Sequence, residues 1–341
     1  MRQEELEKKV TELFERQGFR VEKDGNSLAA VNGKELMLEV FSSENYSKDD
    51  VVGNASGEAN VFVDETLAGV KDLLENDVSV IYEEKEESKF NTPSYELIGD
   101  IAVINDLAGV DREEAVKGIR QHQSVKTILL KKEGLKGEFR VGDYEKLFGD
   151  ETETIHREFG CRFKVDPTKT YFSERFSTER KRVVDQIEDG ENALVMFAGV
   201  GPFAIMAAKL SNPKKVISVE KNPEAARYLK ENIEINGVED IVEGIEGDVS
   251  DVVPELGKFD RVIMPLPGSS QNFLPLALEH TLEEGVVHYY RFLEDENWDE
   301  LEDEIVSSAE KTGSSFTILD RTVTGERGPS VSRVCLDIRK G

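Results

Sequence analysis

Cysteine is almost absent from this sequence, and its scarcity excludes two classes of protein. The only two cysteines, Cys161 and Cys335, stand far apart and form no C-x-x-C pair. A disulfide framework or a zinc ribbon needs more cysteines at closer spacing. We therefore expect a reduced, cytoplasmic protein, and the four histidines suggest no metal site.

Long apolar runs and positive charge are also scarce. A long uncharged stretch, residues 193–208, contains two glycines and a proline. It falls short of the roughly 18 apolar residues that a membrane span needs, and the charged first ten residues lack the apolar core of a signal peptide. The 43 Lys and Arg stand against 70 Asp and Glu, giving a formal net charge of −27. Such a chain repels nucleic acid on average, and we interpret its acidic surface as a fit to a salt-rich, archaeal type of cytoplasm.

Changes in composition predict three domains. Residues 1–83 suggest a small α/β accessory domain, and residues 84–93 a charged and polar linker. Residues 94–165 suggest an α+β domain that connects to the rest and binds RNA. Residues 166–341 alternate strands and helices with short connections, which predicts an α/β fold with a doubly wound, mostly parallel, Rossmann-like sheet.

A local reversal of charge marks residues 117–140, which hold seven basic residues and two acidic ones. In an acidic chain this stretch is the clearest hint of phosphate contact. The alternative is a solvated strand face whose lysines prevent pairing at a sheet edge. The residues that would meet RNA here are Lys126, Lys131, Lys132 and Lys136.

The sequence LVMFAGVGPFAI, residues 194–205, reads as an apolar strand, a tight Gly-rich turn and the start of a helix. Gly199 and Gly201 would let a ligand approach the backbone, and Glu220 ends the next strand, where a carboxylate can accept hydrogen bonds from ribose hydroxyls. A dinucleotide site of the G-x-G-x-x-A type is one interpretation. The other is S-adenosylmethionine, which we favour because it also gives Asp248 a role beside the adenine.

The sequence YFSERFSTERKR, residues 171–182, permits a structural interpretation as a helix start whose basic residues pair with nearby acids. Together with FAGVGPF, HREFGCRFK and GVVHYY, however, it resembles one family: the archaeal and eukaryotic tRNA methyltransferases that make 1-methylguanosine at position 37, beside the anticodon. The resemblance covers roughly residues 94–341. It implies a class I methyltransferase fold, S-adenosylmethionine as cofactor and tRNA as partner.

The resemblance also implies roles for individual residues. The family's Tyr, Arg and Glu fall on Tyr171, Arg175 and Glu179, and a further Arg falls on Arg140. Methylation at N1 of guanine removes a proton and builds charge on O6, so Glu179 is the expected general base and the two arginines the expected cations. Tyr171 or Phe172 would stack on the unstacked base. The expected cofactor residues are Phe197, Gly199, Val200, Gly201, Pro202, Glu220, Asp248 and Pro267, and Arg180 and Arg182 join the lysines as expected RNA contacts.

Two alternatives stay open: one uses the same fold and cofactor for another transfer, and the other follows from two departures from the family pattern. Val195 stands where the family usually has Asp, and Pro265 stands where it has an Asn expected to touch the base. An aminocarboxypropyl transferase acting on a wyosine derivative at the same tRNA position is one alternative. A relative that binds RNA without catalysis is the other. We expect a monomer with no membrane attachment.

Overall fold

The computed structural model divides the chain into two compact units, Met1–Lys89 and Phe90–Gly341. Residues 91–341 are described apart from residues 123, 133–140, 295–296 and 329, with the backbone alone at 327 and 328. In the first unit the structure describes residue 11 and the backbones of 20–24, 27–31, 35–42 and 78–84. The sequence also predicts helices near 2–17 and 64–75 and a strand near 59–63. These segments lie outside the described residues, except for residue 11.

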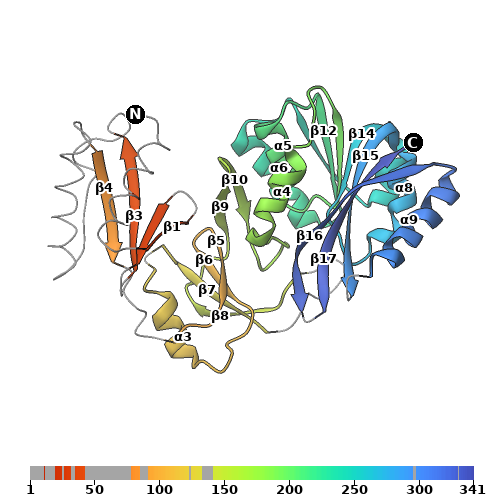
Figure 1. Cartoon of the computed structure of the whole chain (residues 1–341). Helices are drawn as coiled ribbons and strands as arrows, with labels where there is room; N and C mark the ends of the chain where they lie inside the picture. The colour runs from red at the N-terminus through yellow and green to blue at the C-terminus, as the bar shows by residue number, and fades with distance from the viewer. Residues whose placement is uncertain are drawn as a thin grey trace. The chain divides into compact units, whose positions relative to one another are not determined.

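The described part of the first unit is an antiparallel sheet (Figure 1). Its strands are β1 (Arg20–Asp24), β2 (Ser27–Val31), β3 (Glu35–Ser42) and β4 (Val78–Glu84). Each strand pairs antiparallel with the next, in the spatial order β1-β2-β3-β4. The sequence predicts strands at FRVEK, SLAAV, ELMLEVF and VSVIY, and β1 to β4 confirm them.

The second unit begins with a four-stranded mixed sheet. Its elements are β5 (Tyr95–Ile98), β6 (Ile101–Ile104), α3 (Arg112–Ile119), β7 (Thr127–Lys131) and β8 (Tyr144–Phe148). Helix α3 makes the crossover between the parallel strands β6 and β7, and Asp111 caps it by accepting from two backbone amides. One apolar core of this sheet includes Ile104, Ile119 and Ile128.

A two-stranded hairpin follows, formed by β9 (Thr154–Glu158) and β10 (Cys161–Val165). Buried and exposed residues alternate along both strands, so one face packs inward. Phe163 and Cys161 join the apolar core of the large sheet. Asn236 of α6 (Pro223–Asn236) binds the backbone of Arg162 in both directions, which fastens the hairpin to that helix.

A seven-stranded sheet dominates the second unit (Figure 1). Its strands are β11 (Asn192–Met196), β12 (Lys215–Glu220), β13 (Val242–Glu246), β14 (Phe259–Met264), β15 (Thr281–Glu294), β16 (Phe316–Gly328) and β17 (Val331–Lys340). They lie in the order β13-β12-β11-β14-β15-β17-β16. The first five are parallel and the last two pair antiparallel. The predicted doubly wound sheet is confirmed.

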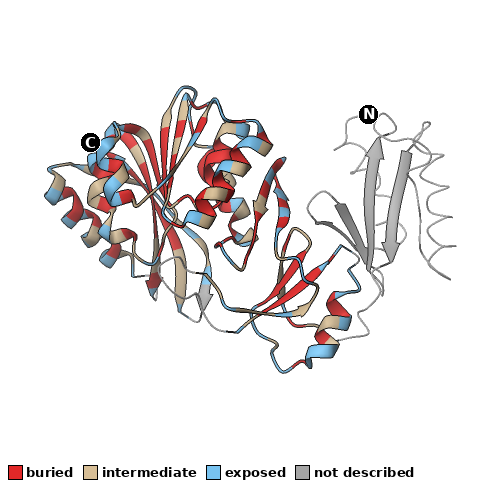
Figure 2. Cartoon of the chain, turned by 180° about the vertical axis from the view of Figure 1, so that it is seen from behind, coloured by how far each residue is buried: buried red, intermediate tan, exposed pale blue. Residues whose placement is uncertain are grey.

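Helices cover both faces of this sheet, and buried residues fill the interfaces (Figure 2). On one face lie α4 (Ser177–Val184), α5 (Pro202–Leu210) and α6. On the other face lie α7 (Val249–Val252), α8 (Leu274–Glu279) and α9 (Trp298–Thr312). Both faces need cover because the strands are apolar on both sides. In β11, Ala193 and Val195 enter the core on one face, and Leu194 and Met196 enter the core on the other.

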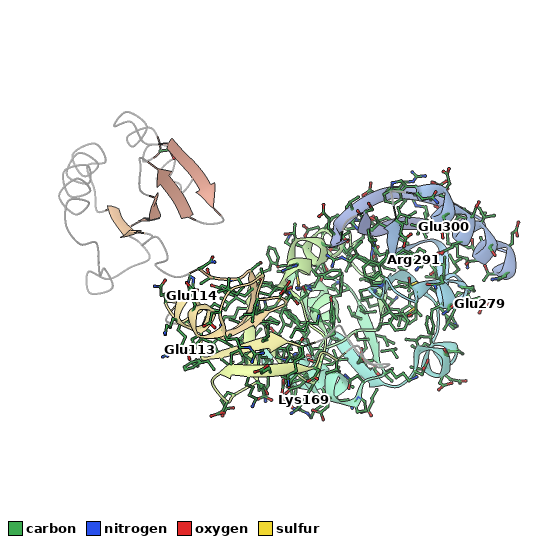
Figure 3. The ribbon with its side chains drawn as sticks, turned by 90° about the horizontal axis from the view of Figure 1, so that it is seen from below. Glu113, Glu114, Lys169, Glu279, Arg291 and Glu300 are labelled. Atoms are coloured by element: carbon green, nitrogen blue, oxygen red, sulfur yellow. The ribbon has the colours of Figure 1, made fainter. Side chains whose placement is uncertain are left out.

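Acidic side chains project from helices throughout the second unit, as the net charge predicts. Glu113 on α3, Glu279 on α8 and Glu300 on α9 are exposed (Figure 3). Within the described residues, no helix combines the length and the apolar character that a membrane crossing requires.

Candidate active site

The predicted cofactor residues meet at one edge of the large sheet. The Gly-rich loop follows β11, Glu220 ends β12, Asp248 follows β13, and Pro265 follows β14. Since β11 to β14 are parallel, their carboxyl ends lie on the same edge. In open α/β sheets that edge is where ligands bind, next to the point at which the strand order reverses.

The Gly-rich loop has a backbone that its glycines make possible. Gly199 and Gly201 have φ angles of 59° and 91°, and a Cβ on Gly201 would lie 2.4 Å from a methyl carbon of Leu229. A Cβ on Gly199 would meet only the carbonyl oxygen of Tyr171, at 3.8 Å. The loop therefore packs tightly on one side and leaves room beside Gly199 for a ligand.

Phe197, at the start of this loop, also has a positive φ, 59°. Its ring packs edge-on against Phe273 at a centroid distance of 5.0 Å. A left-handed backbone at a residue other than glycine stores strain and is concentrated at functional sites. The strain supports a ligand-binding role for this loop.

Glu220 binds the loop directly. Its carboxylate accepts the backbone amide of Gly199 at 2.7 Å and that of Asn222 at 2.8 Å. Burial raises the pKa of Glu220, although these backbone hydrogen bonds oppose the rise. A carboxylate held in this way can also accept hydrogen bonds from the hydroxyls of a ribose.

Asn232 of α6 fastens the same loop from behind. Its side-chain amide donates to the carbonyls of Val200 and Lys164, both at 3.0 Å, and its oxygen accepts the amide of Lys164 at 2.6 Å. Asn232 is fully buried. One side chain thus joins the cofactor loop to strand β10.

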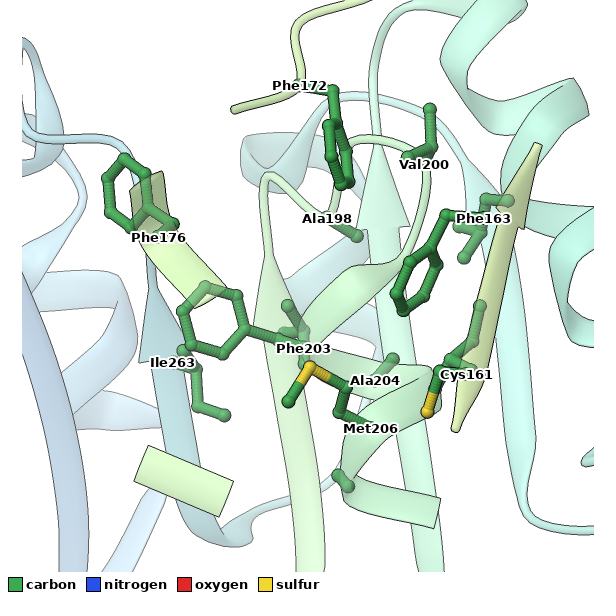
Figure 4. Close-up of a cluster of buried hydrophobic side chains, with 14 of the residues drawn as sticks. Cys161, Phe163, Phe172, Phe176, Ala198, Val200, Phe203, Ala204, Met206 and Ile263 are labelled. Carbon is green, nitrogen blue, oxygen red and sulfur yellow. The ribbon is translucent and has the colours of Figure 1, made fainter. Parts of the chain in front are cut away.

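The YFSERF stretch lies against the Gly-rich loop. One cavity is lined by Tyr171, Phe172, Ser173, Phe176, Arg180, Phe197, Ala198, Gly199, Val200, Pro202, Phe203 and Pro265. Figure 4 shows Phe172 beside Ala198 and Val200, and places Phe176 and Phe203 in the same cluster. Of the predicted residues, the structure therefore brings together Tyr171, Arg180, Phe197, Gly199, Val200 and Pro202.

Tyr171 and Phe172 differ in accessibility. Tyr171 is 46% exposed, whereas Phe172 is 8% exposed and packs on Phe163 and His156. Both side chains line the cavity, but the ring of Tyr171 is the more accessible of the two. Stacking of the base on Tyr171 or Phe172 stays a prediction, and the greater exposure of Tyr171 favours that residue.

Glu179 and Arg180 are buried, and both arginines of α4 are held in ion pairs. Arg180 is 3% exposed and donates two hydrogen bonds of 2.6 Å to the carboxylate of Glu158. Arg182 donates to both oxygens of Glu179, at 2.7 and 2.8 Å, and to Asp337 at 2.7 Å. These guanidiniums are committed to buried carboxylates, so the expected phosphate contacts of Arg180 and Arg182 do not fit their placement.

Glu179 itself lies behind the wall of the cavity and not on it. Besides the two bonds from Arg182, it accepts the hydroxyl of Tyr290 at 2.6 Å. The Tyr290 ring packs on Phe176 and Phe203, which do line the cavity. The carboxylate of Glu179 must leave these partners to touch a base in the cavity.

The network continues beneath the sheet surface to His288. The Nε2 atom of His288 lies 2.8 Å from Nη1 of Arg261, which can only donate, so Nε2 is the acceptor and Nδ1 carries the proton. Nδ1 then donates to Asp337 at 2.7 Å. Burial lowers the pKa of His288, in agreement with a neutral ring.

Asp337 lies at the centre of this network. Burial opposes its ionisation, but hydrogen bonds from His288 and Arg182 outweigh that effect and hold its pKa well below the usual range. Cys335 lies close enough to complete a His, Cys and Asp cluster, in which every member is buried. The guanidinium of Arg182 occupies the carboxylate, so we assign the cluster to hydrogen bonding and not to a metal.

The remaining predicted cations that the structure describes do not line the cavity. Arg175 is mostly exposed and pairs with Glu96 at 3.1 Å. Lys126 pairs with Asp100 at 2.8 Å. Lys131 ends β7 and Lys132 follows it. Arg140 and Lys136 fall outside the described residues.

The two departures from the family pattern have different surroundings. Val195 is fully buried in the apolar core beneath α5 and lines no part of the cavity. Pro265 does line it. Only the change at 265 therefore alters the cavity surface.

Asp248 and Pro267 have partners of their own. Asp248 caps α7 by accepting the amide of Ser250 at 2.8 Å, and it pairs with Lys221 at 2.7 Å. The carbonyl of Pro267 accepts from Arg291 at 3.2 Å. Both follow strands at the ligand edge, but neither lines the cavity.

A second, wider groove of about 720 Å³ lies along the hairpin and β5–β6, against about 60 Å³ for the cavity at the loop. The groove has charges of both signs, and two of its cations, Lys126 and Lys164, are already paired with acids. None of its lining residues comes from the loops that follow β11 to β14 at the ligand edge of the sheet. We therefore place the active site at the smaller cavity, whose wall must yield when a ligand enters.

Sequence reasoning missed several cavity residues, namely Ser173, Phe176, Ala198 and Phe203. Their neighbours in sequence carried the motifs, so adjacency was the available signal. It also missed Arg333 of β17, whose guanidinium stacks on the Phe176 ring at 3.3 Å. Nothing near Arg333 in the sequence marks it.

The fold and the loop define the class of protein. A Gly-rich turn after the central strand, an acid ending the next strand and room beside Gly199 fit S-adenosylmethionine, and this strand order is that of class I methyltransferases. The match to a family model agrees: residues 154–316 match the TRM5/TYW2 methyltransferase domain.

Relatives cover most of the chain. A tRNA (guanine(37)-N(1))-methyltransferase Trm5b of Pyrococcus abyssi is 36% identical over 260 residues, 75% of this chain and 77% of that protein. The crystal structure of Trm5b from Pyrococcus abyssi superposes with a TM-score of 0.67 and 29% identity, over 99% of this chain and 97% of the other. The chain belongs to the TRM5/TYW2 methyltransferase family and is an S-adenosylmethionine-dependent enzyme.

Two further similarities bear on substrate and cofactor. A complex of aTrm5 and tRNALeu matches with a TM-score of 0.65 and 26% identity, over 98% of this chain and 97% of the other. A Methanocaldococcus jannaschii tRNA(Phe) (4-demethylwyosine(37)-C(7)) aminocarboxypropyltransferase is 39% identical over 197 residues, 58% of this chain and 77% of that protein. The Methanocaldococcus jannaschii TYW2 structure with AdoMet matches with a TM-score of 0.59 and 31% identity, over 72% of this chain and 99% of the other.

Proposed function

We propose that the protein transfers a methyl group from S-adenosylmethionine to N1 of guanosine at position 37 of tRNA. The observation that carries this proposal is the shared cavity: the YFSERF stretch and the Gly-rich loop form its two sides. A base held by the first would lie next to a cofactor held by the second. The name of the Pyrococcus abyssi relative supports the same activity.

S-adenosylmethionine supplies an activated methyl group on a sulfonium, so no metal is required for the transfer. On this chain, the open backbone beside Gly199 and the buried carboxylate of Glu220 would hold it. Phe197, Val200, Gly201 and Pro202 shape the loop, and Asp248 and Pro267 lie at the same edge of the sheet. We propose these residues as the cofactor site.

The target base must leave its stack, because N1 lies on the Watson–Crick edge. Extrusion costs a few kcal/mol and is least costly in a single-stranded loop. Tyr171, exposed and at the cavity wall, is the proposed stacking partner. This requirement favours the anticodon loop as the part of tRNA that enters.

Loss of the N1 proton needs a base, and the charge that forms on O6 needs a cation. We propose Glu179 as the base on the strength of the family motif, on the condition that its carboxylate exchanges Arg182 and Tyr290 for the substrate. Arg175 is a proposed cation whose exposed ion pair with Glu96 can open. Arg140 remains a proposal on the motif alone.

We propose tRNA contacts at Lys126, Lys131 and Lys132, and at Lys136 outside the described residues. The described lysines belong to the mixed sheet of the second unit, and Lys126 would exchange Asp100 for phosphate. We also propose a three-domain organisation with boundaries at 83, 94 and 165, and a monomer that acts in the cytoplasm, where it would meet tRNA.

A second candidate is the transfer of the aminocarboxypropyl group of the same cofactor to a wyosine derivative. Two observations favour it: the similarity to the Methanocaldococcus jannaschii aminocarboxypropyltransferase, and Pro265 at the cavity wall in place of Asn. The family motif with Arg175 and Glu179 argues against this candidate, because aminocarboxypropyl transfer gives less reason for a base directed at N1.

The deciding experiment incubates the protein with labelled S-adenosylmethionine and unmodified tRNA transcripts carrying G or A at position 37. Nucleoside mass spectrometry should detect 1-methylguanosine on the G37 transcript alone. A product on both transcripts, or a mass gain other than one methyl, would overturn the assignment. A transcript carrying the wyosine precursor tests the second candidate in the same assay.

A further inference from the structure

Arg333 on β17 lies beside the proposed active site, and the proposed function gives it no role. Its guanidinium stacks on the ring of Phe176, with Cζ 3.3 Å from the ring centroid. Phe176 lines the cavity together with Tyr171. Arg333 is therefore separated from the cavity by one aromatic ring.

The guanidinium is held in a fixed position. Nε donates to Oγ1 of Thr324 at 3.0 Å, and Nη2 donates to the carbonyl of Thr324 at 2.6 Å. Gly325 pairs with Arg333 next to a register shift and has a φ of 146°. A Cβ at Gly325 would lie 3.0 Å from Nη2, so glycine at this position leaves room for the guanidinium.

The positive charge of Arg333 lacks a matching negative charge. Among the described residues, no carboxylate lies within ion-pair distance, and Nη1 has no hydrogen-bond partner. Glu179 is near enough to interact electrostatically, but its oxygens are taken by Arg182 and Tyr290. Burial lowers the pKa of Arg333, with the nearby Tyr171, Tyr290 and Glu179 opposing this effect.

A half-buried cation without a counter-ion is costly to keep. Such a cation becomes favourable when a ligand brings the negative charge. Because its donors are already fixed, they need no reorganisation at the moment of reaction. The Thr324 bonds, the Phe176 stack and Gly325 together provide such a fixed donor. The unpaired Nη1 group leaves two N–H donors for that ligand.

We propose that Arg333 binds an anionic oxygen of the target nucleotide through Nη1. This proposal rests on the proposed function and names one of its specificity contacts. Two oxygens of the nucleotide have the required chemistry: O6 of the base, which gains charge as N1 loses its proton, and a phosphate oxygen beside the extruded nucleoside. Arginine recognises both through the same planar donors.

The test compares Arg333→Gln and Arg333→Lys with Arg321→Gln. Arg321 lies on the neighbouring strand β16, is exposed and pairs with Glu302, so it controls for the loss of one arginine from the hairpin. Each variant is assayed for single-turnover methylation of the G37 transcript, tRNA affinity as a function of salt, S-adenosylmethionine affinity and melting temperature.

If Arg333 acts on O6, Arg333→Gln should lower the single-turnover rate by about 10²-fold at saturating tRNA, with tRNA affinity unchanged. If it acts on phosphate, the rate at saturation should hold, while affinity falls and the slope of log K against log salt drops by about one. In either case Arg333→Lys should restore part of the loss, and Arg321→Gln should match the wild type.

Wild-type behaviour of Arg333→Gln in both measurements would overturn the proposal. So would losses that appear only together with a lowered melting temperature and lost cofactor binding, in Arg333→Gln and Arg333→Lys alike, since these indicate a structural role. A wild-type protein that makes no 1-methylguanosine refutes the proposed function itself, whereas an active wild type with an unaffected Arg333→Gln refutes this inference alone.

Discussion

The backbone amide of Gly199 donates a hydrogen bond of 2.7 Å to Oε2 of Glu220. This contact joins the ends of two neighbouring parallel strands, β11 and β12. It holds the turn whose positive φ angles leave room for a ligand. The protonation state of Glu220 therefore affects both the shape of the loop and the acceptors offered to the cofactor.

We predict that S-adenosylmethionine binding weakens as the pH is lowered from neutrality. Burial raises the pKa of Glu220, so this side chain takes up a proton at a higher pH than an ordinary glutamate and loses its acceptor capacity. The Glu220→Gln variant should bind S-adenosylmethionine at least about tenfold more weakly than the wild type. Its affinity should not depend on pH between neutral and mildly acidic values. Calorimetric titration across pH tests this, with Glu224→Gln of α6 as control. A wild-type affinity for S-adenosylmethionine that does not change with pH would contradict the prediction.

We predict that Glu179→Gln lowers the single-turnover rate by about 10²- to 10⁴-fold, as expected for the loss of a general base. Its effect on tRNA affinity should be far smaller. Tyr290→Phe removes one hydrogen bond to Glu179 and leaves Arg182 in place, so it should slow the reaction much less. Rapid-quench kinetics and filter binding measure both. An affinity loss in Glu179→Gln as large as its rate loss would argue against its role as the base.

We predict that Lys131→Glu combined with Lys132→Glu mainly weakens tRNA binding. The loss should be greatest at low salt, because phosphate contacts release counter-ions and depend on ionic strength. A matched control is Lys214→Glu with Lys258→Glu, two exposed lysines preceding β12 and β14 at the opposite edge of the large sheet. Equal losses in both double variants would show a general charge effect and no local contact.

We predict that Asp337→Asn destabilises the fold by about 3–5 kcal/mol near neutral pH, since it leaves Arg182 and the His288 ring short of a partner. The pKa of Asp337 is lowered in the folded state. The stability that it contributes is therefore complete above the unfolded pKa of about 3.9 and declines as the pH falls below it. Denaturant unfolding of both proteins should give a constant difference at higher pH that shrinks in acid.

We predict that Pro265→Asn increases the rate of 1-methylguanosine formation. Pro265 offers no side-chain hydrogen bond at the cavity wall, and the family's Asn is expected to contact the base. One added hydrogen bond contributes about 0.5–1.5 kcal/mol, a few-fold to about tenfold in rate. The comparison uses single-turnover kinetics at saturating cofactor. A decrease, or a shift towards aminocarboxypropyl transfer, would instead support the second candidate function.

Local patterns predicted the methyltransferase sheet well. The sequence PEAARYLKENIEIN predicts a helix, and it coincides with α6. Asn222 caps the start of this helix, Pro223 suits its first turn, and Gly237 ends it with a φ of 65°. The Gly-rich turn and Glu220 were likewise readable, since strand, turn and acid follow one another within a short stretch. Signals of this kind are local, so a single sequence contains them.

Burial of the charged residues was not readable from the sequence. Arg180 and Arg182 looked like a basic surface, yet they bind Glu158 on β9 and Asp337 on β17, far away in the chain. A sequence shows that a residue is charged but not which distant strand will supply its partner. The same limit hid Arg333, which reaches the site only because β17 lies next to β15 in the sheet.

Asn232 couples the cofactor loop to the β9–β10 hairpin. Its amide holds Val200 of the cofactor loop and Lys164 of β10 at once. Neither segment can shift without straining a bond to the other. Filling of the cofactor loop should therefore slow hydrogen exchange along the β9–β10 hairpin, so that the hairpin reports the state of a site it does not line.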